Sequence, residues 1–141
     1  MKTLFTTLFL FIASISFAQT WTTDFEQAKK QATAENKKII LVFQGSDWCA
    51  PCIKLDQEIW QSTEFKEYAA TNYVMLKADF PRRRKNKLDK AQQAKNDSLA
   101  EKFNPNGNFP LVVVLNNEGK VLKKIGYKSI SPKAYIQEIE K

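Results

Sequence analysis

The sequence predicts an α/β fold in which a central mixed β-sheet is flanked by helices on both faces. Apolar stretches of strand length alternate with stretches of helical periodicity, which is typical of parallel strands joined by right-handed helical crossovers. Near the carboxyl end, two apolar stretches are joined by NNEG, residues 116–119, and this turn indicates an antiparallel hairpin. A sheet that contains both kinds of strand pair is mixed.

The first helix and the first strand follow from simple patterns. Thr23 and Glu26 have the spacing of a capping box, and Phe25, Ala28 and Ala32 then fall on one helical face. The next stretch, KKIILVFQG, is almost continuously apolar. Such a run favours a strand that is buried on both faces of a sheet.

Two helical segments and a second strand come next. A helix is expected from about Cys49, with Ile53, Ile59 and Trp60 as core residues. Ser62 is the expected cap of the helical segment STEFKEYAATN. The stretch YVMLKADF then has the composition of a strand.

The second half of the chain predicts a helix, the hairpin and a final helix. The stretch LDKAQQAKNDSLAEKF is a helix whose inward face is expected to contain Leu88, Ala91, Leu99 and Phe103. The turn cluster NPNGN leads into the hairpin FPLVVVLNNEGKVLKKIGY. The last stretch, SPKAYIQEIEK, is a helix with Ser131 as its cap and Pro132 in its first turn.

The first eighteen residues differ from the rest of the chain. MKTLFTTLFLFIASISFA has one charge, Lys2, then an apolar run, and it ends in small residues at the positions that a signal peptidase recognises. This pattern predicts a secretory signal peptide over residues 1–18. The alternative is a membrane anchor, but the run is shorter than the roughly 20 apolar residues that span a bilayer. We therefore expect one periplasmic domain, residues 19–141, without stable membrane insertion.

The composition is that of an ordinary globular protein, with 43% hydrophobic and 26% charged residues. The formal net charge is +7, and it falls to +6 when Lys2 is removed. A moderately basic exported protein fits acidic partners or lipid headgroups. We expect no nucleic-acid partner.

The motif GSDWCAPC, residues 45–52, contains the only two cysteines, Cys49 and Cys52. A zinc site needs about four Cys or His ligands, and the chain has no histidine. A c-type haem site needs a histidine where Ile53 stands. No metal and no cofactor are therefore expected. A structural disulfide remains as an alternative, although closing so short a loop contributes about 2 kcal/mol at most.

A redox role explains both the spacing and the position of the cysteines. Cys49 is expected where a strand ends and a helix begins, and there the helix dipole favours a thiolate and lowers the pKa of the thiol. Cys52 lies three residues later on the same face of the first turn, and Pro51 fits that turn. We expect Cys49 to attack a substrate disulfide and Cys52 to resolve the mixed disulfide. Trp48 either shields the pair and contacts a partner, or is only a core or rim aromatic.

The chain resembles the thioredoxin superfamily. WCAPC after the strand IILVFQGSD is similar to that family's active-site pattern, and LAEKFNPNGNFPLVVVLNNEGKVLKKIGY is similar to its helix, loop, cis-proline, hairpin and glycine. The resemblance covers nearly the whole mature chain. It is strongest to exported proteins with GSDWC, which are related to the reducing domains of bacterial envelope thiol–disulfide exchange systems. It implies the thioredoxin fold, with Pro110 as the cis-proline facing the cysteines and Phe109 before it.

The sequence departs from the family at the proton-transfer residues. The family has a buried acid in the strand before the motif, where this chain has Val42 and Phe43, and Lys77 is not clearly matched to the lysine paired with that acid. Proton transfer would then use water, Asp47 or Glu58. The alternative for Asp47 is a solvated loop residue.

The basic run RRRKNK, residues 82–87, lies in what resembles an insertion between strand and helix. It is either a solvated loop or a docking patch for an anionic partner or membrane surface.

We predict an exported thiol–disulfide oxidoreductase that reduces or isomerises disulfides of envelope proteins and receives electrons from an upstream envelope donor. Because no histidine stabilises the thiolate, we expect a potential nearer to about −270 mV than to about −120 mV. The alternative is a redox-inactive thioredoxin-like module that binds an acidic partner through the basic run.

Overall fold

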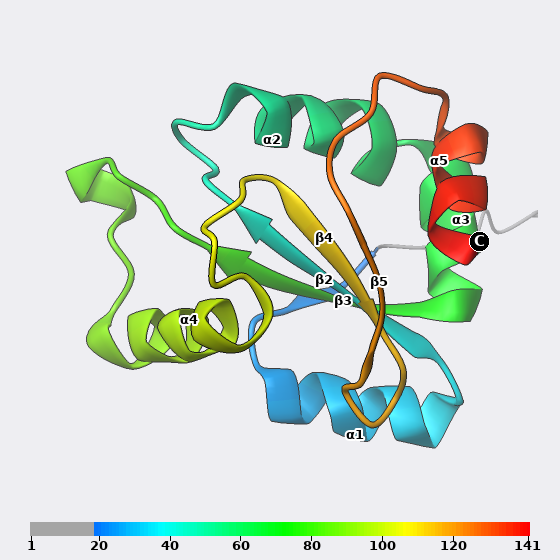
Figure 1. Cartoon of the computed structure of the whole chain (residues 1–141), viewed down its shortest axis with the longest axis horizontal. Coiled ribbons are helices and arrows are strands. Elements are labelled where there is room, and N and C mark those ends of the chain that lie inside the picture. The colour runs from blue at the N-terminus through cyan, green and yellow to red at the C-terminus, as the bar shows by residue number, and fades with distance from the viewer. Residues whose placement is uncertain (1–18) are drawn as a thin grey trace, which may run out of the picture.

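The computed structural model describes residues 19–141 and has the predicted mixed sheet, covered by helices on both faces (Figure 1). The strand order across the sheet is β1-β3-β2-β4-β5. The elements in chain order are β1 (Trp21–Thr22), α1 (Phe25–Glu35), β2 (Lys38–Gln44), α2 (Ala50–Leu55), the π-helical turn η1 (Asp56–Trp60), α3 (Thr63–Asn72), β3 (Tyr73–Asp79), the 3-10 turn η2 (Arg84–Asn86), α4 (Lys90–Phe103), β4 (Leu111–Leu115), β5 (Val121–Ile125) and α5 (Pro132–Glu140). The predicted signal peptide, residues 1–18, lies outside the described residues. None of the helices within residues 19–141 has the length and hydropathy to cross a membrane.

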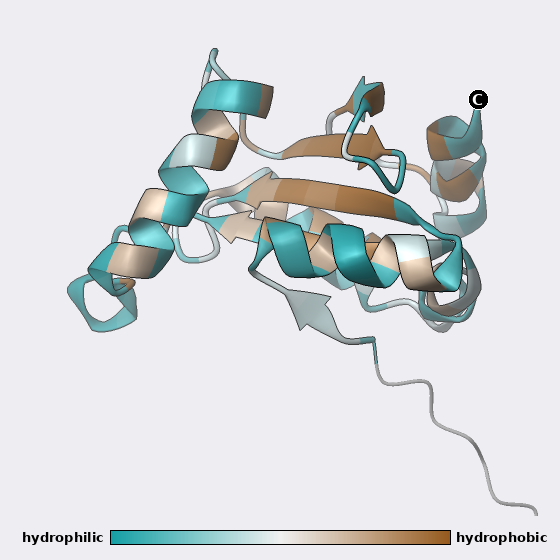
Figure 2. Ribbon diagram, turned by 90° about the horizontal axis from the view of Figure 1, so that it is seen from below, coloured by the Kyte–Doolittle hydropathy of each residue, from teal (hydrophilic) through white to brown (hydrophobic). Residues whose placement is uncertain are grey.

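The central strand β2 is buried on both faces because helices cover each side of the sheet. Ile39, Leu41 and Phe43 lie in the core beneath α1 and α4. Ile40 and Val42 lie in the opposite core, with side chains of α2, η1, α3 and α5. Since successive strand residues point to opposite faces, both cores need apolar residues, and this explains the uninterrupted apolar run. Figure 2 shows the hydrophobic strands between helices with hydrophilic outer faces.

Three segments meet at one edge of the sheet. Strands β2 and β3 are parallel, with Gln44 opposite Asp79, so the segments that follow them leave the sheet at the same edge. Strand β4 is antiparallel to β2, with Leu111 opposite Phe43, so the segment before β4 enters at that edge too. The strand register therefore brings together three segments that lie far apart in the sequence (Figure 1).

The helix starts are confirmed in part. Ser62 and Ser131 cap α3 and α5 as predicted. The capping box at Thr23 is wrong, because Asp24 is the cap of α1 and accepts the Gln27 N–H at 2.9 Å. A carboxylate forms stronger, charge-assisted hydrogen bonds than a hydroxyl, so the helix begins one residue later. The two-residue strand β1 was not predicted, since it is too short for any periodicity.

Two core predictions in α4 are wrong. Leu99 and Phe103 are buried, but Ala91 is exposed and Leu88 is half-buried and precedes the helix. The first turns of α4 extend beyond the sheet, so they have no core to face (Figure 1). The buried residue of the middle turn is Asn96 instead, and it donates a hydrogen bond to the Asp79 carbonyl at 2.8 Å.

The helix after the cysteines also differs from the prediction. Ile59 and Trp60 are buried as expected, whereas Ile53 is 38% exposed. In a regular α-helix, residues seven apart share a face. The π-turn η1 interrupts that regularity, so Trp60 turns inward while Ile53 faces solvent near the cysteines.

Candidate active site

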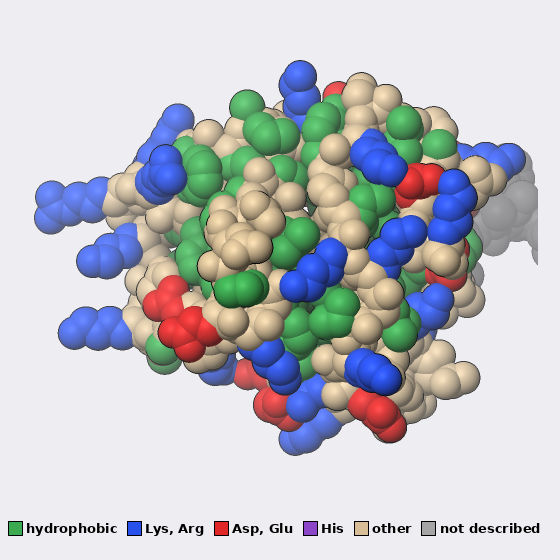
Figure 3. Space-filling view, viewed as in Figure 1, with side chains coloured by type: hydrophobic (Ala, Val, Ile, Leu, Met, Phe, Trp, Pro, Cys, Tyr) green, Lys and Arg blue, Asp and Glu red, His purple; other side chains and the backbone are tan. Residues whose placement is uncertain are grey.

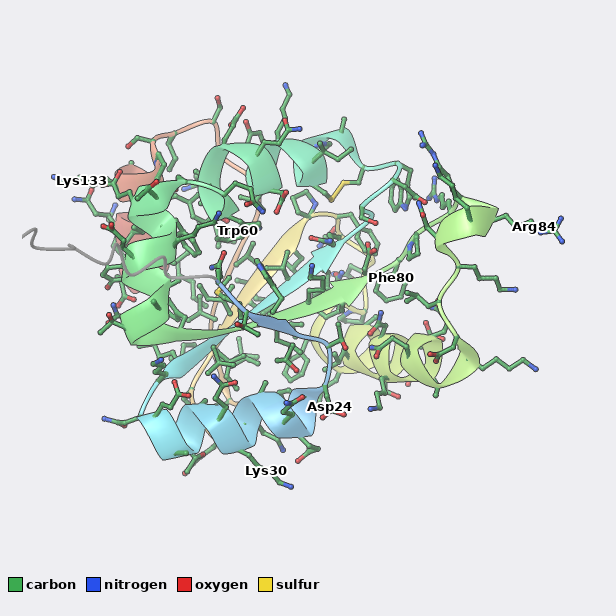
Figure 4. The ribbon with its side chains drawn as sticks, turned by 180° about the vertical axis from the view of Figure 1, so that it is seen from behind. Asp24, Lys30, Trp60, Phe80, Arg84 and Lys133 are labelled. Carbon is green, nitrogen blue, oxygen red and sulfur yellow. A yellow bond between two sulfur atoms is a disulfide. The ribbon has the colours of Figure 1, made fainter. Side chains whose placement is uncertain are left out.

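The two cysteines lie at the start of the helix that follows β2, as predicted. Cys49 is the N-cap of α2, and its carbonyl accepts the Ile53 N–H at 3.1 Å. Cys52 lies in the first turn and is disulfide-bonded to Cys49, with Cα atoms 5.2 Å apart. Figure 4 shows this disulfide beside the start of α2. Each cysteine is 4% exposed, so their assignment to separate roles depends on helix position and not on exposure. Pro51 is exposed in the first turn, where its missing N–H costs no hydrogen bond.

The half-buried indole of Trp48 is held on four sides. Its Nε1–H donates to the Phe80 carbonyl at 2.8 Å. The Arg82 guanidinium lies over its ring, 3.7 Å from the centroid, and the Phe109 ring meets it edge-to-face at 5.5 Å. A Cβ on Gly45 would lie 2.2 Å from the indole, so this position needs glycine for the ring to fit. The Trp48 indole is therefore held in one position by residues on both sides of the cysteine motif.

The Phe109–Pro110 peptide bond is cis, as predicted. Pro110 is buried, and Phe109 is half-buried between Trp48 and Phe80, whose ring centroid lies 5.6 Å away. The segment before β4 thus packs against the residue that precedes Cys49. This contact joins the cis peptide to the cysteine motif.

The Asp47 carboxylate is hydrogen-bonded to the basic loop, a contact that neither of its two sequence-based interpretations included. Its carboxylate accepts hydrogen bonds from the N–H groups of Arg82 and Arg83 and from the side chain of Asn86, each at 2.9 Å. The Arg82 N–H, together with these other donors, holds the pKa of the Asp47 carboxyl below its usual range. Asp47 therefore fixes the basic loop to the cysteine motif.

A second carboxylate makes the reverse connection. Asp79, the last residue of β3, accepts hydrogen bonds from the Ser46 N–H at 2.9 Å and the Ser46 hydroxyl at 2.6 Å. Asp47, which follows β2, thus binds the loop after β3. Asp79, at the end of β3, binds the loop after β2. The sequence shows no sign of either pairing, because the partners are more than 30 residues apart and meet only through strand register.

Asp47 and Glu58, the two carboxylates that the sequence suggested for proton transfer, do not line the pocket next to Cys52. A pocket of about 350 Å³ opens beside Cys52, and Asp56 and Lys77 supply its titratable side chains. Glu58 instead accepts a hydrogen bond from the Tyr127 hydroxyl at 2.6 Å and raises the pKa of that hydroxyl.

Asp56 was missed by sequence reasoning, although a signal existed. It lies four residues after Cys52, and the Asp56 N–H bonds the Cys52 carbonyl, so the two side chains are neighbours on one helix face. Lys77 lies on β3 with its Nζ 5.1 Å from the Trp21 ring centroid. Within residues 19–141, no cluster of three or more potential ligand side chains could hold a metal ion.

Comparison with known proteins agrees with this geometry. The Thioredoxin-like family model matches residues 20–117. The chain is 35% identical to Disulfide bond reductase DsbH of Chlamydia pneumoniae over 116 residues, which are 82% of this chain and 68% of DsbH. It is 27% identical to Thioredoxin-related protein DsbJ of the same organism over 106 residues, 75% of this chain but 30% of DsbJ. A solved structure of DsbH oxidoreductase superposes with a TM-score of 0.78 at 33% identity, covering 86% of this chain and 81% of that one.

A mixed sheet of this order with a CxxC disulfide at the start of α2 defines a thioredoxin-fold dithiol protein. The chain belongs to the thioredoxin-like family. It is a thiol–disulfide oxidoreductase whose CxxC pair is Cys49 and Cys52.

Proposed function

We propose that this oxidoreductase is an exported reductase of protein disulfides that works in the periplasm. The main support is the position of the CxxC pair, at the start of α2 and joined through Trp48 to the segment of the cis peptide. The relative DsbH is named as a disulfide bond reductase, and the match covers 82% of this chain. Protein disulfides are the substrates, and an upstream thiol donor in the envelope restores the dithiol.

The reaction has two exchange steps. In the reduced protein the Cys49 thiolate attacks one sulfur of the substrate disulfide, forms a mixed disulfide and releases the other sulfur as a thiolate. The Cys52 thiolate then attacks the Cys49 sulfur and releases the second substrate thiolate. Two electrons pass to the substrate, whose thiolates take up two protons, and the Cys49–Cys52 disulfide is formed. The donor reverses both steps with its own dithiol.

The role of each cysteine follows from its place in the helix. Cys49 is the N-cap, outside the first turn, where the free N–H groups stabilise a negative charge. Cys52 is inside the first turn and borders the pocket with Asp56, which can accept the Cys52 proton before the second step.

We propose that the substrate chain lies against the residues around the pair. Trp48 and Phe109 present half-buried aromatic surface beside the cysteines, Pro51 is exposed in front of them, and Pro110 ends the neighbouring segment. The side chains of Trp48, Phe109 and Pro51 supply apolar contact without a charge, which suits a reductase that accepts different substrate sequences.

Insulin reduction tests the proposal. The wild type with a small-molecule dithiol as donor should accelerate insulin precipitation, and Cys49→Ser should remove the acceleration. Cys52→Ser should accumulate a mixed disulfide that is visible on a non-reducing gel. A wild type as inactive as Cys49→Ser would support the alternative, a redox-inactive module that binds an acidic partner.

The assignment of the nucleophile has its own test. Limited alkylation of the reduced protein at pH 6–7 should modify Cys49 before Cys52, as read by mass spectrometry of peptides. Faster modification of Cys52 would reverse the two roles.

The export proposal depends on residues 1–18 of the sequence. Expression of the full chain in a diderm bacterium should give a periplasmic protein whose first residue is near Gln19. Retention of the uncleaved chain in the membrane fraction would instead support an anchor.

A further inference from the structure

The loop between β3 and α4 contains a concentrated positive charge that the redox chemistry does not use. Arg82, Arg83, Arg84, Lys85 and Lys87 are all exposed, and none of them forms an ion pair with residues 19–141. Six other lysines form ion pairs with carboxylates elsewhere in the described chain. Figure 3 shows Lys and Arg side chains extending from the side of the molecule where Figure 1 places this loop.

The loop is also held in a defined shape. The Asp47 carboxylate receives hydrogen bonds from two of its backbone N–H groups and from Asn86, and η2 forms one 3-10 turn within it. These bonds use the backbone and the amide, so the cationic ends of Arg83, Arg84 and Lys85 remain free. Figure 4 shows Arg84 pointing away from the molecule into solvent.

The basic loop is in direct contact with the cysteine motif. Arg82 stacks on Trp48, which precedes the reactive Cys49, and Asp47 belongs to the same motif. A polypeptide bound at the dithiol can therefore extend over the loop. From this geometry we propose that the loop is a docking surface for an acidic segment of the protein that exchanges disulfides with the CxxC pair.

An acidic polypeptide fits this surface better than a membrane does. Guanidinium groups form paired hydrogen bonds with carboxylates. Binding in a membrane interface would need apolar side chains next to the basic ones, and the exposed large hydrophobic residues of the described chain, Ile53, Val121 and Leu122, lie outside the loop.

The proposal rests on the reductase function, and the experiment separates the two. The probes are two disulfide-bonded peptides with one sequence around the cystine, flanked in one by four glutamates and in the other by four serines. The rate constant for oxidation of the pre-reduced protein is measured with each peptide in single turnovers, at low and at high ionic strength. Complementary charge accelerates association at least ten-fold at low salt. We expect the glutamate peptide to react about ten-fold faster at low salt and nearly as slowly as the serine peptide at about 1 M salt.

A charge-matched pair of variants locates the effect. The triple variant Arg83→Gln, Arg84→Gln, Lys85→Gln should lose the preference for the glutamate peptide and keep the wild-type rate with the serine peptide. The control Lys30→Gln, Lys120→Gln, Lys133→Gln loses the same charge on other elements, and Lys30 and Lys133 lie far from Arg84 in Figure 4. It should keep most of the preference.

Each outcome decides one question. Equal rates for the two peptides with the wild type, or equal loss in both triple variants, would overturn the docking surface while leaving the reductase intact. No reaction with either peptide would mean that the reductase function itself is wrong. Loop-dependent sedimentation with vesicles containing about 30% phosphatidylglycerol, without a peptide preference, would reassign the loop to lipid and also overturn the proposal.

Discussion

Replacement of Gly45 by alanine should loosen the active site through a single methyl group. A Cβ at this position would lie 2.2, 2.4 and 2.6 Å from three atoms of the Trp48 indole. These atoms belong to a rigid ring, so the whole indole must move. The movement breaks the hydrogen bond from Nε1–H to the Phe80 carbonyl and disturbs the contacts with Phe109 and Arg82.

The size of the effect follows from the contacts that are lost. The hydrogen bond contributes about 1 kcal/mol, the edge-to-face contact about 0.5–1.5 kcal/mol, and the exposed cation–π contact about 0.5–1 kcal/mol. Since the displaced indole recovers part of these contacts, we expect a loss of about 2 kcal/mol in the free energy of unfolding. With a slope of about 2 kcal/mol/M, the urea midpoint should fall by about 1 M.

Urea titration of the oxidised protein, followed by far-ultraviolet circular dichroism, measures this loss without depending on tryptophan fluorescence. Gly126→Ala is the matched control, because a Cβ there meets only the Pro110 carbonyl oxygen at 3.9 Å, an ordinary contact. Its midpoint should change little. If Gly45→Ala and Gly126→Ala unfold at the same urea concentration, Trp48 is not held as described.

Four further predictions concern the site. Asp47→Ala should release the basic loop, so that trypsin cleaves the loop several-fold faster at pH 7.5 while the rest of the fold stays intact. Unchanged cleavage would mean that the hydrogen bonds to Asp47 do not hold the loop. Hydrogen bonds lower the pKa of the Asp47 carboxyl in the folded protein. The stabilisation from these bonds is therefore complete above the unfolded pKa of about 3.9 and is lost as pH falls through the folded pKa. The Arg82 amide resonance should move below about pH 4 and stay constant between pH 5 and 8. Asp56→Asn should slow the second exchange step and accumulate mixed disulfide in quenched-flow experiments, while an equal decay rate would exclude Asp56 as the proton acceptor. Equilibration with glutathione buffers should give the pair a potential nearer to about −270 mV than to about −120 mV, and a value above about −160 mV would indicate an oxidant.

The sequence alone determined the layers of the fold and the reactive pair. The apolar run of β2 shows burial on both faces, because a strand between two helical layers needs apolar side chains on each side. The caps Ser62 and Ser131 and the spacing of Cys49 and Cys52 are equally local, since each depends on residues within one helical turn. Predictions that needed the neighbouring element failed: Ile53 and Ala91 are apolar, but a π-turn and a helix extending past the sheet leave them exposed.

Only the tertiary structure decided what surrounds the cysteines. The parallel register of β2 and β3 sets Gln44 opposite Asp79, so the loops after both strands leave the sheet together. That register lets Asp47 bind the basic loop and lets Trp48 bind the Phe80 carbonyl. Hydrogen bonds of this kind join groups that are neighbours in space and distant in sequence, and their partners follow from the pairing of whole strands. No local pattern encodes that pairing, so the sequence predicted the reactive thiols while the fold determined which charges and rings stand beside them.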